Sequence, residues 1–284
     1  MRVVVEEAGR ADRAVAAALG GRGRRELARI FDDGGVKREG KRLRKGDVVA
    51  RGDVLEVEDH GPDRAPPVAE PLPLEVLFED ARRIAVLKPP GIASHPLRAG
   101  ELGTLANRLV ARYPECIEAG ADPREAGLVH RLDHGTSGIL VAARTRSAWD
   151  EMRADFRAGR VRKEYLALVA RGAAGGSCDE PLSVAGGRAV VGGRDAREAR
   201  TTWVPIETIP AGTLLLCTTT TGRMHQIRAH LAHAGWPIVG DSLYGGAKGP
   251  DTLIEFFLHA SRISVVPEVE APLPPDRRFT LTQF

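Results

Sequence analysis

The densest run of side chains that could carry out chemistry is residues 130–138, His-Arg-Leu-Asp-His-Gly-Thr-Ser-Gly, followed directly by the apolar run 139–143. A polar segment that leads into a buried strand lies at the end of that strand, and loops held there by a rigid sheet often carry function. Asp133 is the candidate catalytic carboxylate of this run. Gly135 and Gly138 allow the backbone to turn tightly. In a second interpretation the loop is only structural, and Asp133 caps backbone amides.

A second polar run covers residues 222–231, Gly-Arg-Met-His-Gln-Ile-Arg-Ala-His-Leu. The spacing predicts a helix over roughly 224–234 with an apolar stripe, and places His225 and Arg228 together on the adjoining face. Arg228 then lies at the margin of the core, where a guanidinium needs a carboxylate partner. An Asp–Arg pair in a partly buried site is directional because the guanidinium fork fixes its geometry.

The histidines of this run allow another interpretation, a metal site built from His225, His230 and His233. However, the first two would lie about 140° apart on a helix. The zinc-protease pattern of two histidines four apart with a glutamate is also absent from this run. Three scattered cysteines give no short ligand spacing. We therefore expect no metal.

Two shorter stretches could border the same site. In residues 163–169, charged or aromatic side chains alternate with apolar ones, as in a strand. This segment contains Tyr165, one of three tyrosines in the chain. Tyr165 either packs at the edge of the core or stacks on a base. Lys88 begins a Lys-Pro-Pro-Gly turn that precedes Ser-His-Pro at residues 94–96. This rigid segment either borders a cleft or only forms a turn between secondary-structure elements.

From Leu74 onward, strands and helices alternate and would position these side chains. Strand-like runs lie at 75–80, 83–89, 137–144, 163–170, 201–208 and 213–221, and helical patterns lie near 104–113, 146–157 and 224–234. Strands are numerous and β-branched residues are frequent. The pattern therefore predicts an α+β catalytic domain, residues 74–284, around a mixed or antiparallel sheet.

The first 59 residues follow a different pattern. Residues 10–20 and 24–35 indicate two helices closed by glycine pairs, and short strand-like pieces with turn residues follow them. A small helix–helix–β module is expected at 1–59. Residues 60–73 contain five prolines and no apolar periodicity, which is typical of a semi-extended linker.

Composition limits the possible function classes. The 284 residues are 43% hydrophobic and 28% charged, with a net charge of +3, as in an ordinary globular protein. No run approaches the roughly 20 apolar residues of a membrane-spanning helix, and the N-terminal sequence has no secretory pattern. We expect a monomeric cytoplasmic protein with no membrane partner.

Residues 22–45 carry ten basic and four acidic side chains, which give a local net charge of +6. This stretch either faces a polyanion or is only a solvated surface.

Taken in order, these motifs resemble the RluA-type pseudouridine synthases. The resemblance covers roughly residues 75–270 and rests on the segments 87–96, 130–143, 163–169, 222–245 and 257–265. Leu87 and Met224 depart from it, because the family commonly has Asn at the first position and Thr or Ser at the second. Residues 1–59 resemble, more weakly, the RNA-binding module named after ribosomal protein S-four.

The resemblance implies a pseudouridine synthase, an isomerase that detaches uracil from ribose, turns it and rejoins it through carbon five without a cofactor. It implies that Asp133 acts at the sugar as nucleophile or base, and that Arg228 pairs with it. Tyr165 would lie against the uracil and help to move the carbon-five proton, and Arg131 would fill the position of the flipped nucleotide. The remaining motif residues expected around the substrate are His130, Arg223, His225, Gln226 and Lys88.

The RNA partner stays open at this point. Large-subunit ribosomal RNA is the first expectation, since the N-terminal module resembles that of ribosomal members, and transfer RNA is the second. Two other functions remain: a non-catalytic RNA-binding or ribosome-assembly factor, and a hydrolase using Ser137. The hydrolase pattern is incomplete, because a nucleophile elbow requires Gly-x-Ser-x-Gly between a strand and a helix.

Overall fold

The computed structural model describes residues 1–20, 24–32, 34–58, 65–251, 253–267 and 269–282. The chain divides into two compact units, Met1–Asp63 and Arg64–Phe284. Each has its own buried apolar cluster, as expected for independent domains. Within the ranges given, none of the helices combines the length and apolar character needed to cross a membrane.

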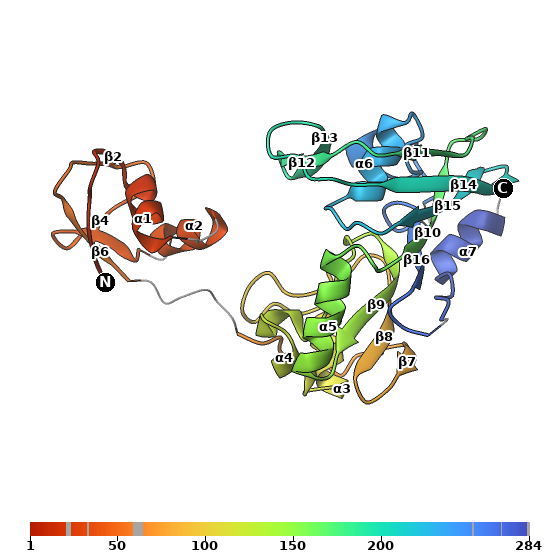
Figure 1. The fold of residues 1–284 in the computed structure, drawn as a ribbon, viewed down its shortest axis with the longest axis horizontal. Coiled ribbons are helices and arrows are strands. Elements are labelled where there is room, and N and C mark those ends of the chain that lie inside the picture. Colours follow the sequence, from red (N-terminus) through yellow and green to blue (C-terminus); the bar gives the residue numbers. More distant parts are fainter. Residues whose placement is uncertain (21–23, 33, 59–64, 252, 268, 283–284) are drawn as a thin grey trace. The chain divides into compact units, whose positions relative to one another are not determined.

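The N-terminal unit packs two helices on small sheets (Figure 1). The helices are α1 (Ala11–Leu19) and α2 (Arg24–Asp32). A four-stranded sheet has the order β1-β6-β3-β4, formed by β1 (Arg2–Val4), β6 (Val54–Val57), β3 (Val36–Arg38) and β4 (Lys41–Arg42). A second pair joins β2 (Gly9–Arg10) and β5 (Val48–Val49). The β1 strand, which pairs antiparallel with β6, was not expected from the sequence.

The larger unit is built on an eight-stranded mixed sheet of order β11-β14-β15-β10-β16-β9-β8-β7. Its strands are β7 (Val76–Glu79), β8 (Arg83–Lys88), β9 (Ser137–Ala143), β10 (Lys163–Val169), β11 (Gly176–Cys178), β14 (Thr201–Ile209), β15 (Gly212–Thr219) and β16 (Leu258–Ile263). Only the β9–β16 pair within this sheet is parallel. The α+β prediction with a mixed sheet is thus confirmed. A separate hairpin joins β12 (Leu182–Ala185) and β13 (Arg188–Val191).

Helices cover this sheet and bury its apolar side chains. Figure 1 shows α3 and α5 beside the β7–β9 half, α6 beside β14, and α7 near the C-terminus. Their bounds are α3 (Leu105–Arg112), α4 (Cys116–Ala119), α5 (Arg146–Arg157), α6 (Gln226–His233) and α7 (Pro275–Thr282), with short 3-10 turns at Pro123–Glu125 and Ser242–Tyr244. The α5 helix begins at a Thr145 cap, whose hydroxyl accepts from the Ala148 amide.

The predicted linker differs from the structure. Residues 60–64 lie outside the described ranges, but residues 65–73 belong to the larger unit. There the Asn107 Nδ2 donates to Val68 O at 2.8 Å, and the Glu70 amide donates to Asn107 O at 3.0 Å. Prolines remove backbone donors but leave carbonyl acceptors, so a proline-rich segment without regular secondary structure can still bind along a helix.

Gly138 is required where the only parallel pair of the large sheet forms. It lies opposite Ala260 of β16 with a φ of 119°, a conformation that side chains other than glycine rarely adopt. A Cβ at this position would lie 2.1 Å from Ala260 O. The close approach of β16 to β9 therefore depends on a missing side chain at the end of the candidate catalytic loop.

We expect Gly138→Ala to reduce the free energy of unfolding by about 3 kcal/mol or more, because the added methyl group would both strain the backbone and push the strands apart. Urea denaturation measures this change. Gly175→Ala is the matched control, since its Cβ would meet its nearest atom, Trp203 O, at an ordinary 3.4 Å. Equal stability of the two variants would show that the β9–β16 contact tolerates a side chain.

Candidate active site

Asp133 lies in the loop that leads into β9, with its side chain 25% exposed at the edge of a cavity. Its backbone carbonyl accepts a hydrogen bond from the Thr136 amide at 3.0 Å, which closes the turn before the strand. The residues that follow, from Ser137 to Ala143, are all buried in the sheet. The rigid β9 strand therefore holds this carboxylate close to its N-terminal end, as the sequence pattern predicted.

Arg228 joins Asp133 to a second carboxylate. The Arg228 Nη1 donates to Asp133 Oδ2 at 3.0 Å, while its Nε and Nη2 donate to the two oxygens of Asp241 at 2.7 and 2.9 Å. Arg228 and Asp241 are 7% and 1% exposed. The two-pronged bond to Asp241 fixes the plane of the guanidinium, and the remaining nitrogen is thereby aimed at Asp133.

Aromatic rings enclose this guanidinium. Its central carbon lies 4.1 Å from the centroid of the Phe256 ring and 5.1 Å from that of Tyr244. Burial alone would lower the pKa of Arg228, but the hydrogen bonds and charge of Asp241, and then those of Asp133, raise it. Arg228 is therefore a permanent cation next to Asp133.

Asp241 was not predicted from the sequence. It is a single acid after the apolar run Trp-Pro-Ile-Val at 236–239, followed by Gly240. A buried arginine at the core margin requires enough acceptors for its five donors, and the single carboxylate of Asp133 does not supply them. This requirement is the signal that could have identified Asp241.

His225 is positioned differently from the predicted helix. It adopts a left-handed conformation, φ 52°, and precedes α6, so it does not share a helical face with Arg228. Met224, expected in the apolar stripe, is 39% exposed. The His225 Nδ1 lies 3.1 Å from the Tyr244 hydroxyl, and its Nε2 lies 4.0 Å from Asp133 Oδ2. Burial lowers the pKa of His225 although the charge of Asp133 opposes this, which favours a neutral imidazole.

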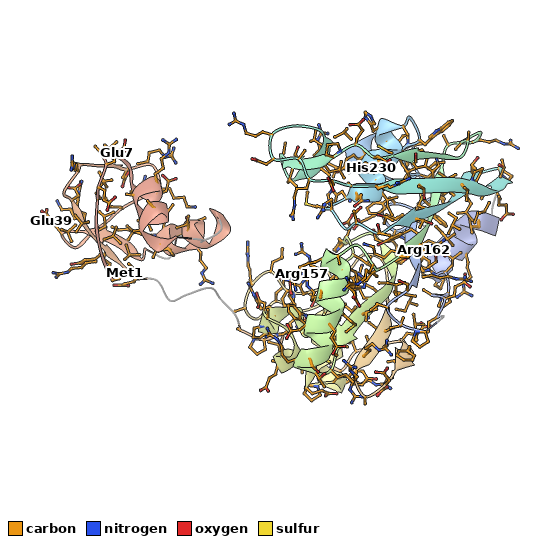
Figure 2. The ribbon with its side chains drawn as sticks, viewed as in Figure 1. Met1, Glu7, Glu39, Arg157, Arg162 and His230 are labelled. Carbon is orange, nitrogen blue, oxygen red and sulfur yellow. The ribbon has the colours of Figure 1, made fainter. Side chains whose placement is uncertain are left out.

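The His230 of the metal interpretation uses both ring nitrogens within the fold. Its Nδ1 lies 2.9 Å from Thr201 Oγ1 and its Nε2 lies 3.0 Å from Glu180 O (Figure 2 labels His230 within α6). Because both nitrogens already have partners, the imidazole is not available as a ligand. Its neighbours make it a structural residue of the α6 helix.

Two buried basic side chains bind backbone carbonyls of the loop that carries Asp133. Lys88, 0% exposed, donates to Pro89 O, Ile92 O and His134 O at 2.8 to 3.0 Å. Arg277 of α7 donates through Nη2 to Gly135 O at 2.6 Å. Burial, followed by the charge of Arg277, lowers the pKa of Lys88 to about 7. Lys88 therefore binds the loop from inside the fold and does not line the cavity. The sequence analysis had suggested that it contacts the substrate.

The Ser137 side chain does not support the hydrolase interpretation. Its hydroxyl lies 2.8 Å from His259 Nδ1, but both residues are 0% exposed. The His259 Nε2 lies 3.1 Å from a carbonyl, Ala271 O, so it carries the proton and Nδ1 accepts from the serine. Burial lowers the pKa of His259 to about 4, which keeps the ring neutral. This pair joins β9 to β16 and cannot reach a substrate.

Tyr165 lies between the two halves of the domain. It is partly buried against the apolar clusters on both sides, and it lines the same cavity as Asp133. Burial, followed by the charge of Asp133, raises the pKa of its hydroxyl, so the phenol stays protonated at neutral pH. Among the described residues this hydroxyl has no hydrogen-bond partner. The arrangement favours contact through the ring and hydroxyl donation over action as a base.

The cavity that joins these residues has a volume of about 900 Å³. Seven arginine and lysine side chains line it, together with two carboxylates, those of Asp133 and Glu125. The basic residues are Arg131, Arg153, Arg157, Lys163, Arg197, Arg223 and Arg228. Figure 2 shows Arg157 at the end of α5. The lining suits a large anionic ligand.

The other predicted site residues have different positions around this cavity. Arg131 is exposed along it, whereas His130 stacks on Phe156, and its Nε2 accepts from the Val141 amide at 3.2 Å. Burial lowers the pKa of His130 to about 3. Arg223 Nε donates to Glu198 O at 2.9 Å, and the Gln226 side chain bonds the backbone or hydroxyls of neighbouring strands. His130 and Gln226 are thus held mainly by the fold itself.

Asp241→Asn should remove one of the two bonds that orient Arg228 and leave the guanidinium under-neutralised in a buried site. We expect the free energy of unfolding to fall by about 3 kcal/mol. Chemical denaturation measures this loss. The control is Asp251→Asn, at a carboxylate that is 88% exposed. A loss within about 0.5 kcal/mol of the control would contradict a structural dependence on the Asp241 charge.

Known proteins are similar to this chain over most of its length. The model of the family described as RNA pseudouridylate synthase matches residues 82–233, more than half of the chain. An uncharacterized RNA pseudouridine synthase of Chloroflexus aurantiacus is 39% identical over 303 residues, covering 100% of this chain and 93% of that protein. The ribosomal large subunit pseudouridine synthase D of Xylella fastidiosa is 36% identical, covering 89% of this chain and 82% of the relative.

A solved structure shows the same fold. Human RNA pseudouridylate synthase domain containing 4 has a TM-score of 0.57 and 22% identity, over 73% of this chain and 91% of that one. The matched family region contains Asp133, Tyr165 and Arg228, while Asp241 lies just beyond it. The family model covers more than half of the chain and the 39% identical relative covers all of it, so the chain belongs to the RNA pseudouridylate synthase family.

Proposed function

We propose that this enzyme converts uridine to pseudouridine in structured RNA, with large-subunit ribosomal RNA as its substrate and transfer RNA as the alternative. The observation that carries the proposal is the Asp133–Arg228 pair at 3.0 Å, at the edge of a cavity lined by seven basic side chains. The relatives named for the ribosomal large subunit support the choice of RNA. We further propose that the protein acts as a monomer in the cytoplasm.

The chemistry requires one group at the sugar and others at the base. The bond from ribose carbon one to uracil nitrogen one breaks, a bond to carbon five forms, and the carbon-five proton is lost while nitrogen one gains a proton. We assign the work at the sugar to Asp133, as nucleophile or base. Arg228 keeps this carboxylate ionised and oriented, and Tyr165 lies against the uracil ring.

The cavity geometry is consistent with a flipped nucleotide. The Asp133 carboxylate is only 25% exposed, so a uridine within a stacked helix cannot approach it. The nucleotide must leave its stack at a cost of a few kcal/mol. Arg131 lies exposed beside Asp133 on the same loop, where its side chain can fill the vacated position.

Asp133→Asn provides the direct test. The substitution keeps size and hydrogen bonding but removes the charge, so pseudouridine formation should fall by several orders of magnitude while RNA binding persists. The measurement is tritium release from carbon five of uridine in a large-subunit RNA transcript, followed by mapping of the modified position. Asp155→Asn, at a 42% exposed carboxylate, is the control.

Two outcomes would contradict this proposal. Turnover by the Asn variant within tenfold of wild type would remove Asp133 from the reaction. RNA binding by the wild-type protein with no tritium release from either ribosomal or transfer RNA would favour a non-catalytic RNA-binding factor.

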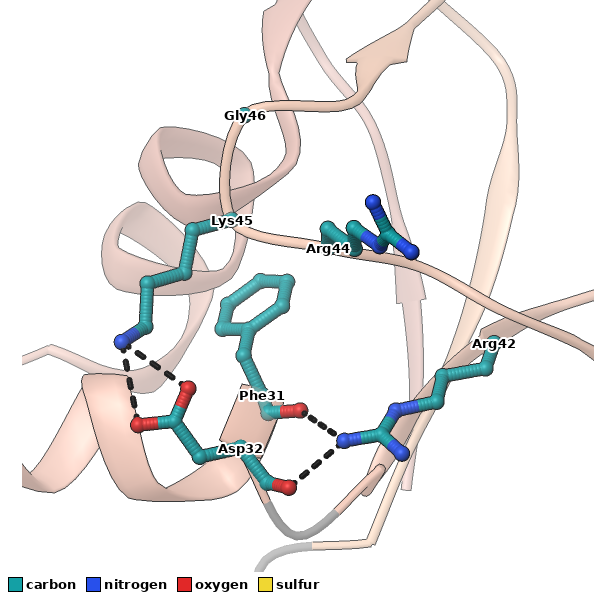
Figure 3. Close-up of a pocket in the computed structure, with 6 residues that line it drawn as sticks. All are labelled: Phe31, Asp32, Arg42, Arg44, Lys45 and Gly46. Carbon is teal, nitrogen blue, oxygen red and sulfur yellow. Dashed lines mark hydrogen bonds and ion pairs between the residues drawn. The ribbon is translucent and has the colours of Figure 1, made fainter.

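We also propose that the N-terminal unit binds RNA phosphates. A hollow of about 550 Å³ lies at the end of α2, lined by Phe31, Asp32, Arg42, Arg44, Lys45 and Gly46 (Figure 3). Arg42 donates to the Phe31 and Asp32 carbonyls at 3.1 and 2.6 Å, and Lys45 pairs with the Asp32 carboxylate at 3.1 Å. Figure 3 draws no such bond to the Arg44 guanidinium, which borders the same hollow.

These contacts reduce the charge available to RNA. Within the described part of the net +6 stretch, Lys37 pairs with Glu58 and Arg38 pairs with Asp53. Exposed pairs of this kind are weak and exchange readily with other ions. Arg42, Arg44 and Lys45 border one hollow, where such exchange would let them bind a phosphate together, so we expect these three residues to contribute most of the phosphate contacts.

A protein that begins at Ala65 should keep its chemistry, because Asp133, Tyr165 and Arg228 all belong to the larger unit. Loss of three phosphate contacts should flatten the slope of log affinity against log salt by about 2. RNA binding titrated between low and moderate salt measures the slope. An unaltered slope together with unaltered choice of uridine would show that the basic stretch only solvates a surface.

A further inference from the structure

Lys163 is a buried cation at the wall of the catalytic cavity. It is 5% exposed, it lines the cavity, and it begins β10, the strand that carries Tyr165. Its Nζ donates to Thr221 O at 2.5 Å and lies 5.6 Å from the centroid of the Phe156 ring. An ammonium has three protons to donate, and this carbonyl takes one.

No carboxylate neutralises this ammonium among the described residues. The next residue along the strand, Glu164, pairs instead with Arg162 at 2.7 Å. Burial, followed by the charge of Arg223, lowers the pKa of Lys163 to about 8. Lysine is almost never buried without a partner, because an unpaired charge away from water is costly.

Arg223 adds a second cation to the same wall. Its Nε donates to a backbone carbonyl, Glu198 O, and within the described chain it forms no ion pair. His130, which lies close enough for the charge of Lys163 to act on it, is neutral because burial lowers its pKa to about 3. The charge of Glu198 acts on Arg223 from a distance, but neither Arg223 nor Lys163 forms an ion pair within the described residues.

We propose that Lys163 and Arg223 form a subsite for a backbone phosphate of the target nucleotide. This inference rests on the proposed function, since it identifies how the RNA strand is held beside Asp133. Two neighbouring cations require a ligand with formal negative charge, which a phosphodiester supplies and a uracil carbonyl does not.

The spacing between Lys163 and Tyr165 along β10 matches the size of one nucleotide. Lys163 and Tyr165 are two residues apart on β10, where both pair regularly with β15, so their side chains lie on the same face. Two residues of a strand span roughly 6.5 Å. A nucleotide whose uracil lies against Tyr165 can therefore place an adjacent phosphate at Lys163.

The experiment compares ligands that differ only by a phosphate. Affinities of uridine, uridine 3′-monophosphate and uridine 5′-monophosphate are measured by NMR titration for the wild-type protein, Lys163→Met and Lys248→Met. Lys248 is an exposed control, 86% accessible. The wild type and Lys248→Met should bind at least one monophosphate about tenfold more tightly than uridine, and Lys163→Met should lose this preference while still binding uridine normally.

Three results would overturn the subsite. The wild type could show no preference for a monophosphate, or no binding of one. Lys163→Met could keep the preference. It could also weaken uridine and both monophosphates equally, as expected if Lys163 only anchors Thr221. Because these measurements need no turnover, failure of tritium release by the wild type would count separately, against the proposed isomerase activity.

Discussion

The central constraint of this domain is one buried guanidinium shared between two carboxylates. Asp241 binds Arg228 through two nitrogens and thereby aims the third at Asp133, while Phe256 and Tyr244 exclude water from the group. Burying the cation is favourable only while both acids are present. The same network therefore links the stability of the fold to the ionisation and direction of the candidate catalytic carboxylate.

The loop that carries Asp133 is also held through its own backbone. Lys88 donates to the carbonyl of His134, and Arg277 donates to the next carbonyl, Gly135 O. Arg277 also donates to Phe256 O at 2.8 Å, so the α7 helix contacts both the loop and the backbone of the residue whose ring covers Arg228. Residues beyond the matched family region thus help to position the site.

Charge is distributed unevenly around the cavity. The carboxylate of Asp133, the proposed catalytic group, is paired with Arg228, whereas the side chains of Lys163 and Arg223 donate to backbone carbonyls and form no ion pair among the described residues. Such a surface attracts a polyanion and directs its phosphates away from the carboxylate. In the proposed function, recognition of the RNA strand and chemistry at the sugar therefore fall to different residues of one cavity.

The sequence by itself determined the elements and the order of the motifs, because local periodicity decides which segments form helices and strands. It indicated α5 at residues 146–157 and the β9 strand after the polar loop, and the family resemblance of its motifs implied Asp133 and Arg228 as partners. Only the tertiary structure decided the left-handed turn at His225 and the pairing of Arg228 with Asp241. It also decided that Lys88 and Ser137 are buried. These contacts join segments that are separated by 13 residues for Arg228 and Asp241 and by 122 residues for Ser137 and His259, and no local pattern contains that information.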